Sequence, residues 1–130
     1  MSDFSSAIRV SAAGLRAQAT RLRHVSENIA NADTPGYRRK TVSFETRRDS
    51  FTGPETVATG RVRLDRSDLP RIYDPSNALA DTTGYYEGSN VDLMIEIADA
   101  REAQRSYEAN LRMFEQSRQM SANLLDLLRN

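Results

Sequence analysis

The chain contains no cysteine and no tryptophan, and it has a single histidine, His24. Without cysteine it can form neither a disulfide framework nor a thiolate metal site, and one histidine is too few for the ligand sets that hold zinc. No apolar run in the sequence is long enough to span a membrane. Residues 1–10 include Asp3 and are not continuously apolar, so we expect no cleaved signal peptide.

Charge is balanced in total but unevenly distributed. The formal net charge of the 130 residues is zero. Residues 37–71 carry nine basic and five acidic side chains, a net charge of about +4, whereas residues 85–130 carry five basic and eight acidic ones, about −3. Residues 3–30 carry about +2. The two ends are therefore complementary in sign, which favours their pairing within one chain or between chains.

The first predicted element is a helix over residues 3–31. Apolar residues recur at a four-three spacing from Ile8 to Ile29, which is a heptad seam interrupted only at Ser26. The Thr-Pro-Gly sequence at residues 34–36 ends the helix, because proline cannot continue it and Pro-Gly fits the two central positions of a type II turn.

The middle of the chain predicts β-structure. Residues 38–73 alternate between apolar and polar side chains, as half-buried strands of a small antiparallel sheet do, with a turn near residues 52–54. Residues 74–89 are rich in Asp, Asn, Ser and Gly and predict a loop. Such a sheet is marginal by itself and needs a helix or a neighbour to cover its apolar face.

A second, longer helix is predicted at the C-terminal end. Ser89 or Asn90 could cap it, and a second four-three apolar seam continues to Leu128, over a length of about 57 Å. A small domain cannot bury so long a helix against itself. Only 38% of the residues are hydrophobic, so we expect part of the apolar surface to be covered by other chains.

These elements define the expected fold class and domain organisation. We expect a mainly α protein whose long N- and C-terminal helices form a coiled-coil-like hairpin or bundle in an assembly, with a small β-rich insert between them. The corresponding divisions are residues 1–37 for the N-terminal helix and turn, 38–89 for the β-rich and loop insert, and 90–130 for the C-terminal helix.

Candidate chemical groups are few. A catalytic His24 would need a nucleophile or an orienting carboxylate nearby, and Glu27 offers only a helix-surface pair, so we expect His24 on the surface. Asp92, Glu96 and Asp99 share one side of the second helix, but the Glu-x-x-His motif of di-metal bundles is missing. We therefore expect a solvated acidic start to this helix rather than a metal or acid–base site.

The basic residues of the insert are the remaining candidates. Residues 38–40 and five further arginines could bind nucleic acid, but acidic residues are interspersed among them, so we expect a solvated or protein-binding surface. Gly-rich phosphate loops and a nucleophile elbow are absent from the sequence. These observations favour an assembly protein without catalysis, metal or cofactor over a hydrolase that would depend on His24 or Asp92.

Several motifs resemble those of a known family. SAAGLRAQ at residues 11–18 and NIANADTPGYR at residues 28–38 resemble the N-terminal signature of the bacterial flagellar axial proteins, which include the rod and hook proteins. NVD at residues 90–92 and AQRSYEAN at residues 103–110 resemble the C-terminal signature. The chain length and YDPSNALAD at residues 73–81 most resemble one proximal rod protein, whereas the short link at residues 34–36 resembles the other.

The resemblance implies a structural subunit of the flagellar basal-body rod, the driveshaft that crosses the periplasm. It implies export through the flagellar type III apparatus. It implies contacts with other rod proteins, with copies of the chain and with the MS-ring and export-gate side of the basal body, and no contact with nucleic acid. The alternative is a cytoplasmic helical adaptor or export chaperone. The expected assembly-interface residues are Leu15, Leu22, Asn28, Ile29, Asn31, Asp33, Pro35, Gly36, Tyr37, Asn90, Val91, Asp92, Tyr107, Asn110, Leu111, Phe114 and Leu125.

Overall fold

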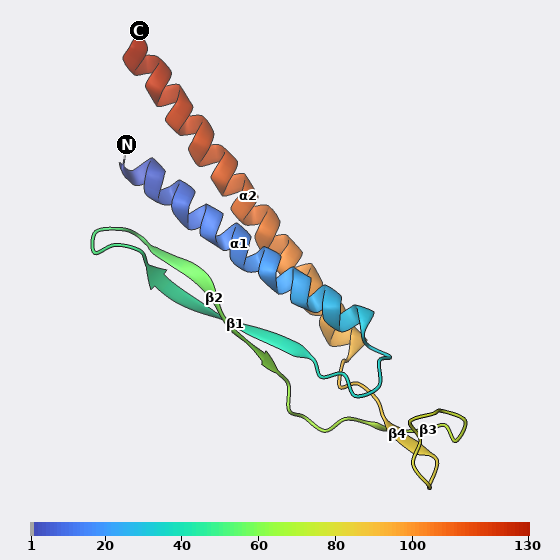
Figure 1. Ribbon diagram of the computed structural model, residues 1–130. Helices are drawn as coiled ribbons and strands as arrows, with labels where there is room; N and C mark the ends of the chain where they lie inside the picture. Colours follow the sequence, from blue (N-terminus) through green and yellow to red (C-terminus); the bar gives the residue numbers. More distant parts are fainter. Residues whose placement is uncertain (1) are drawn as a thin grey trace.

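Two long antiparallel helices form the body of the molecule (Figure 1). The computed structural model describes residues 2–130. Helix α1 spans Ser2–Ala30 and helix α2 spans Leu93–Arg129, so both predicted helices are present with bounds close to those expected. The N- and C-terminal ends lie at the same end of the helix pair. The predicted mainly α fold with a small antiparallel insert is therefore confirmed for the single chain.

The turn after α1 has the predicted geometry. Gly36 has a φ of 75°, the left-handed value that the second central position of a type II turn requires. The backbone N–H of Tyr37 donates to the carbonyl of Thr34 at 3.2 Å and closes the turn. The N–H of Gly36 donates to the carbonyls of Glu87 and Gly88, both at 3.2 Å, and so ties the turn to the chain that leads into α2.

Small residues make the contact between α1 and α2. Gly14 of α1 and Ala103 of α2 are buried there, whereas the buried Ala13 and Ala17 of α1 lie beside residues 47–59 of the insert. A Cβ atom added at Gly14 would lie 2.5 Å from Oδ1 of Asn110, which is closer than non-bonded atoms approach. The glycine therefore leaves room for the side chain of Asn110 between the two helices, although it lowers helix propensity.

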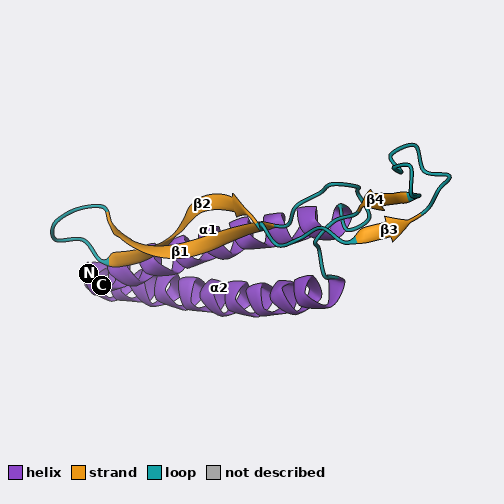
Figure 2. Ribbon diagram, turned by 90° about the horizontal axis from the view of Figure 1, so that it is seen from below, coloured by secondary structure: helices purple, strands orange, loops and turns teal. Residues whose placement is uncertain are grey.

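The β insert packs against α1 on the side away from α2. Strand β1 (Lys40–Arg48) pairs antiparallel with β2 (Glu55–Leu64), and a register shift between Val42 and Phe44 marks a bulge. Both strands lie against α1, and among the described residues the backbone of the hairpin does not approach that of α2. Helix α1 is therefore the middle of three layers (Figure 2).

Two predictions for residues 71–92 need correction. The segment predicted as a loop contains strand β4 (Tyr85–Glu87), which pairs antiparallel with β3 (Arg71–Tyr73) at the far end from the termini. The N-cap of α2 is Asp92, whose carboxylate accepts from the N–H of Met94 at 3.0 Å, rather than Ser89 or Asn90. Those two side chains are instead bonded to more distant segments.

Candidate assembly site

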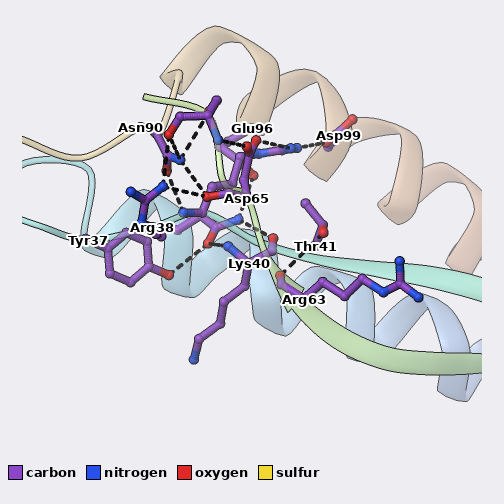
Figure 3. Close-up of polar contacts among 12 residues, drawn as sticks. Tyr37, Arg38, Lys40, Thr41, Arg63, Asp65, Asn90, Glu96 and Asp99 are labelled. Atoms are coloured by element: carbon purple, nitrogen blue, oxygen red, sulfur yellow. Dashed lines mark hydrogen bonds and ion pairs between the residues drawn. The ribbon is translucent and has the colours of Figure 1, made fainter. Parts of the chain in front are cut away.

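A network of polar residues, centred on the buried side chains of Asn28 and Glu96, connects the end of α1 to the start of β1 and the start of α2. We call it the Asn28 network. In Figure 3, Tyr37, Asn90 and Glu96 point toward this junction, whereas the side chain of Lys40 points away from it. The members of the network are Asn28, Tyr37, Arg39, Lys40, Asn90 and Glu96.

Asn28 lies at the centre of the network and is only 1% exposed. Its Oδ1 accepts from the Tyr37 hydroxyl at 2.8 Å and from the Lys40 backbone N–H at 2.9 Å. Its Nδ2 donates to the Lys40 carbonyl at 2.9 Å and to Glu96 Oε2 at 3.3 Å. Both polar atoms of the buried amide are thus satisfied, and the Asn28 side chain fixes three segments relative to one another. Burial raises the pKa of the Tyr37 hydroxyl, which keeps it a neutral donor.

Glu96 supplies the buried charge of the network and is 0% exposed. It forms an ion pair with Nε of Arg39, whose Nη2 also donates to Asp99 at 3.0 Å. Burial alone would lower the pKa of Arg39, but the hydrogen bond and charge of Glu96, together with Asp99 and Asp65, raise it above its ordinary value. The prediction of a solvated acidic helix start is therefore wrong for Glu96 and Asp99, because a cation distant in sequence pairs with both carboxylates, whereas Asp92 is exposed as predicted.

The basic run at residues 38–40 is also used within the chain. Arg38 donates to the carbonyls of Asp65 at 3.2 Å and Ser67 at 2.9 Å, and the Arg39 N–H donates to Asn90 Oδ1 at 2.6 Å. Lys40 Nζ lies 2.8 Å from a carboxylate oxygen of Glu27. These three half-buried residues thus hold loop and helix ends together within the chain, a role that the sequence did not predict.

His24 is buried rather than exposed as predicted. It is 7% exposed, and neither ring nitrogen has a hydrogen-bond partner among the described residues. Glu27 comes within 3.7 Å of Nδ1, but its carboxylate is hydrogen-bonded to Lys40. His24 lines a cavity of about 350 Å³ between α1, the start of β1 and α2. Helix periodicity did not reveal this burial, because the histidine lies beside the apolar seam.

The signature residues have two kinds of position. Asn28, Tyr37 and Asn90 belong to the network, and Asp92 caps α2. Asn31 donates from Nδ2 to the Glu27 carbonyl at 2.8 Å. Half-buried in the chain are Leu15, Leu22, Asn31, Tyr37, Asn90, Val91, Tyr107, Asn110 and Phe114. Exposed are Ile29, Asp33, Pro35, Gly36, Asp92, Leu111 and Leu125.

The face of α2 that meets α1 is not the leucine-rich seam. At 3.6 residues per turn, Ala103, Asn110 and Ser121 lie on the α1 side, and larger apolar residues remain exposed on either side of that line. We call these two groups the first and second flank. The first flank consists of Leu93, Ile97, Leu111 and Leu125, which are 36–47% exposed. The second flank consists of Ile95, Met113, Met120 and Leu127.

The arrangement offers surfaces and supports rather than a reaction centre. In residues 2–130 no helix is long and apolar enough to cross a membrane. No three His, Cys, Asp or Glu side chains of the described chain are grouped so that they could hold a metal ion. The sequence analysis missed the roles of Arg39, Glu96 and Gly14. Only Gly14 left a signal, since it lies among alanines on one face of a helix.

Comparisons with known proteins agree with the motifs. Residues 8–38 match the family described as flagella basal body rod protein, and residues 82–127 match the C-terminal family of the flagellar basal body rod FlgEFG proteins. The flagellar basal-body rod protein FlgC of Agrobacterium fabrum is 48% identical, with 99% of this chain and 98% of that protein covered. FlgC of Bacillus subtilis is 32% identical over 92% and 95%, and FlgC of Salmonella typhimurium is 32% identical over 91% and 92%.

The matches also decide between the two kinds of proximal rod protein. The short link at residues 34–36 favoured the other kind, FlgB, but the relatives that cover almost the whole chain are FlgC proteins. The assignment to the FlgB-type position is therefore wrong. The FlgC matches cover more than nine-tenths of the chain, whereas the resemblance to FlgB rested on one turn of three residues. Basal-body rod proteins are structural parts of the flagellum, and this chain belongs to that family, among the FlgC-like rod proteins.

Proposed function

We propose that this chain is a rod subunit that polymerises through its terminal helices into the proximal part of the driveshaft, crosses the periplasm there and transmits torque. One observation carries the proposal: α1 and α2 meet through small residues, while both apolar flanks of α2 stay exposed. A helix with apolar residues on more than one side is typical of helices that have several neighbours. The division into residues 1–37, 38–89 and 90–130 then separates two polymerising ends from an insert.

The exposed flanks leave a substantial free energy to be gained on assembly. Fully burying a leucine or isoleucine side chain contributes ~1.5–3 kcal/mol, so residues that are already half covered would contribute about 1 kcal/mol each. The four residues of the first flank would thus give roughly 4 kcal/mol for one neighbouring helix, before the entropy of association is subtracted. That amount is modest for a single contact and becomes large when it is repeated along a filament.

The Asn28 network supports this function by setting the direction of the helices. It fixes the last turn of α1 and the first turn of α2 to β1 through the hydrogen bonds of the buried Asn28 amide. Polymerisation into a filament requires that every subunit present its two contact surfaces at the same angle, since a heterologous contact that does not close builds an open helix. The partners would be copies of the chain and neighbouring rod proteins, the MS-ring and export-gate side of the basal body, and the flagellar export apparatus.

Leu111→Asp tests the proposal. Leu111 is 36% exposed on the first flank, so we expect the free chain to keep its fold and its export, while rod assembly and swimming are lost. Gln116→Asp is the matched control, because it adds the same charge at an exposed position elsewhere around α2. Immunoblots of exported protein, electron microscopy of basal bodies and motility assays give the readouts. Motile Leu111→Asp cells with normal rods would contradict the proposal.

A cytoplasmic adaptor or export chaperone would behave differently. It would remain as a small folded oligomer of full, cooperative helicity and would be missing from purified basal bodies. Sedimentation and circular dichroism of the purified chain, together with electron microscopy of basal bodies that carry a tagged copy, distinguish the two functions. We expect the tag in the rod.

A further inference from the structure

A basic groove lies at the end of strand β2. Its lining residues all belong to the β insert and none to α1 or α2. It has a volume of about 870 Å³. We call it the arginine groove, and the residues that line it are Arg38, Arg61, Val62, Arg63, Leu64 and Arg66. None of these described lining residues is acidic, so the groove carries a positive charge beside two exposed apolar side chains.

Most of the charge of the groove is not neutralised within the described residues; the exception is Arg38, which lies near the carboxylate of Asp65. Arg39, Arg48 and Arg71 all lie within ion-pair distance of a carboxylate. Arg61, Arg63 and Arg66 form no such pair among the described residues, and Arg38 donates only to backbone carbonyls. Arginine is suited to bidentate pairing with carboxylates at interfaces. The chemistry of the groove therefore fits an acidic surface that also carries an apolar side chain.

Helix α2 presents such a surface. Glu108, Leu111 and Glu115 are spaced at i, i+3 and i+7, which places them on one face, and all three are exposed. Neither carboxylate forms an ion pair in the described part of the chain. The glutamates are about 10 Å apart along the helix. Arg61 and Arg63 are about 7 Å apart along β2, within reach of such a pair because arginine side chains are long.

The two surfaces cannot meet within one molecule. Helix α1 lies between the hairpin and α2 (Figure 2), and the described residues of β2 make no contact with α2. The contact must therefore join two molecules. Because the two patches differ, each copy would use its groove toward one neighbour and its helix toward another, and such a heterologous contact continues as an open filament.

We propose that the arginine groove of one copy receives the Glu108–Leu111–Glu115 face of α2 from a second copy. Leu111 packs on Val62 and Leu64, while the two glutamates pair with the groove arginines. The proposal rests on the assembly function above and adds a specific contact to it, one in which the β insert, and not only the helices, joins the subunits.

Disulfide cross-linking tests this contact directly, because the natural chain has no cysteine. The variant that carries both Arg63→Cys and Glu108→Cys is expressed as the sole copy, basal bodies are purified and oxidised, and the products are separated without reductant. We expect species at multiples of the chain mass. Either single substitution should give none, and neither should the control pair Arg63→Cys with Ala109→Cys, which moves one thiol around the helix. Assembled rods of the first variant that yield no multiples would overturn the groove contact and leave the rod function intact.

Charge reversal is the second test, and it does not require two thiols to lie within disulfide distance. In the purified full chain, Arg61→Glu with Arg63→Glu should weaken self-association about tenfold at low ionic strength, since each exposed ion pair is worth a few-fold in an equilibrium constant. Adding Glu108→Arg with Glu115→Arg should restore most of the loss, and salt should reduce the difference. Sedimentation measures both. The proposal would be refuted if the arginine substitutions left self-association unchanged, or if adding the glutamate substitutions did not restore it. Pairing of the groove with a different rod protein would give that same result.

Discussion

Removing Arg39 tests whether the Asn28 network holds the helix pair together. In Arg39→Met the apolar stem is kept, but Glu96, which is 0% exposed, loses its ion pair. Asn28 Nδ2 at 3.3 Å is then its remaining hydrogen-bond partner. Breaking a buried ion pair from one side costs about 3–5 kcal/mol. Arg39 itself is about one-fifth exposed, which weakens the pair, so we expect a loss near the lower end, about 3 kcal/mol.

The converse variant should cost less. Glu96→Gln keeps the shape and removes the charge, and Arg39 retains Asp99 at 3.0 Å, so we expect a loss of about 1–2 kcal/mol. The double variant should lose less free energy of unfolding than the two single variants lose together, since the partners are coupled. Urea unfolding of the full chain, followed by far-ultraviolet circular dichroism, measures these free energies. Arg105→Met, at an exposed position that forms no ion pair among the described residues, should change stability by less than about 0.5 kcal/mol. A loss below about 1 kcal/mol in Arg39→Met, or a strictly additive cycle, would refute the reasoning.

Two further predictions concern packing and pH. Gly14→Ala places a Cβ 2.5 Å from Asn110 Oδ1, so it should destabilise the chain by about 1–3 kcal/mol despite better helix propensity. Asn110→Ala in the same chain should recover most of this loss, and independent losses in urea unfolding would contradict the close contact. The hydrogen bond from Lys40 lowers the pKa of Glu27, and Glu27 in turn raises the pKa of Lys40. The stabilisation from this pair is therefore present between the ordinary values of 4.5 and 10.5, and is lost as the pH falls through the lowered pKa or rises through the raised one. In Lys40→Met the midpoint of thermal unfolding should fall less than in the natural chain when the pH is taken below or above this range. An unchanged pH profile would show that the pair does not matter.

The sequence predicted the elements well because their signals are local. Heptad spacing located both helices, Pro35 and Gly36 located the turn that ends α1, and alternation located the β1–β2 hairpin. Strand β4 was missed because it is only three residues long and is surrounded by turn-forming residues. The family was identifiable from its motifs, since these combine several residue types in a fixed order.

The environment of single side chains was not predictable in the same way. His24 and Glu96 were both expected in solvent and are both buried. The partners of Glu96 are Arg39 and Asn28, which are 57 and 68 residues away in sequence. Spacing along one helix cannot report a cation that arrives from another segment, so a buried acidic residue and a solvated one look alike in the sequence.

By itself the sequence determined that there are two long helices, where they lie to within a few residues, and that each carries an apolar stripe. Only the tertiary structure decided which side of α2 meets α1. It selected the line through Ala103 and Asn110 and left Leu111 and Leu125 exposed. The physical reason is that periodicity measures how apolar each side of a helix is. The approach of two backbones depends instead on side-chain size, and Gly14 and Ala103 allow that approach where leucines would hold the helices apart.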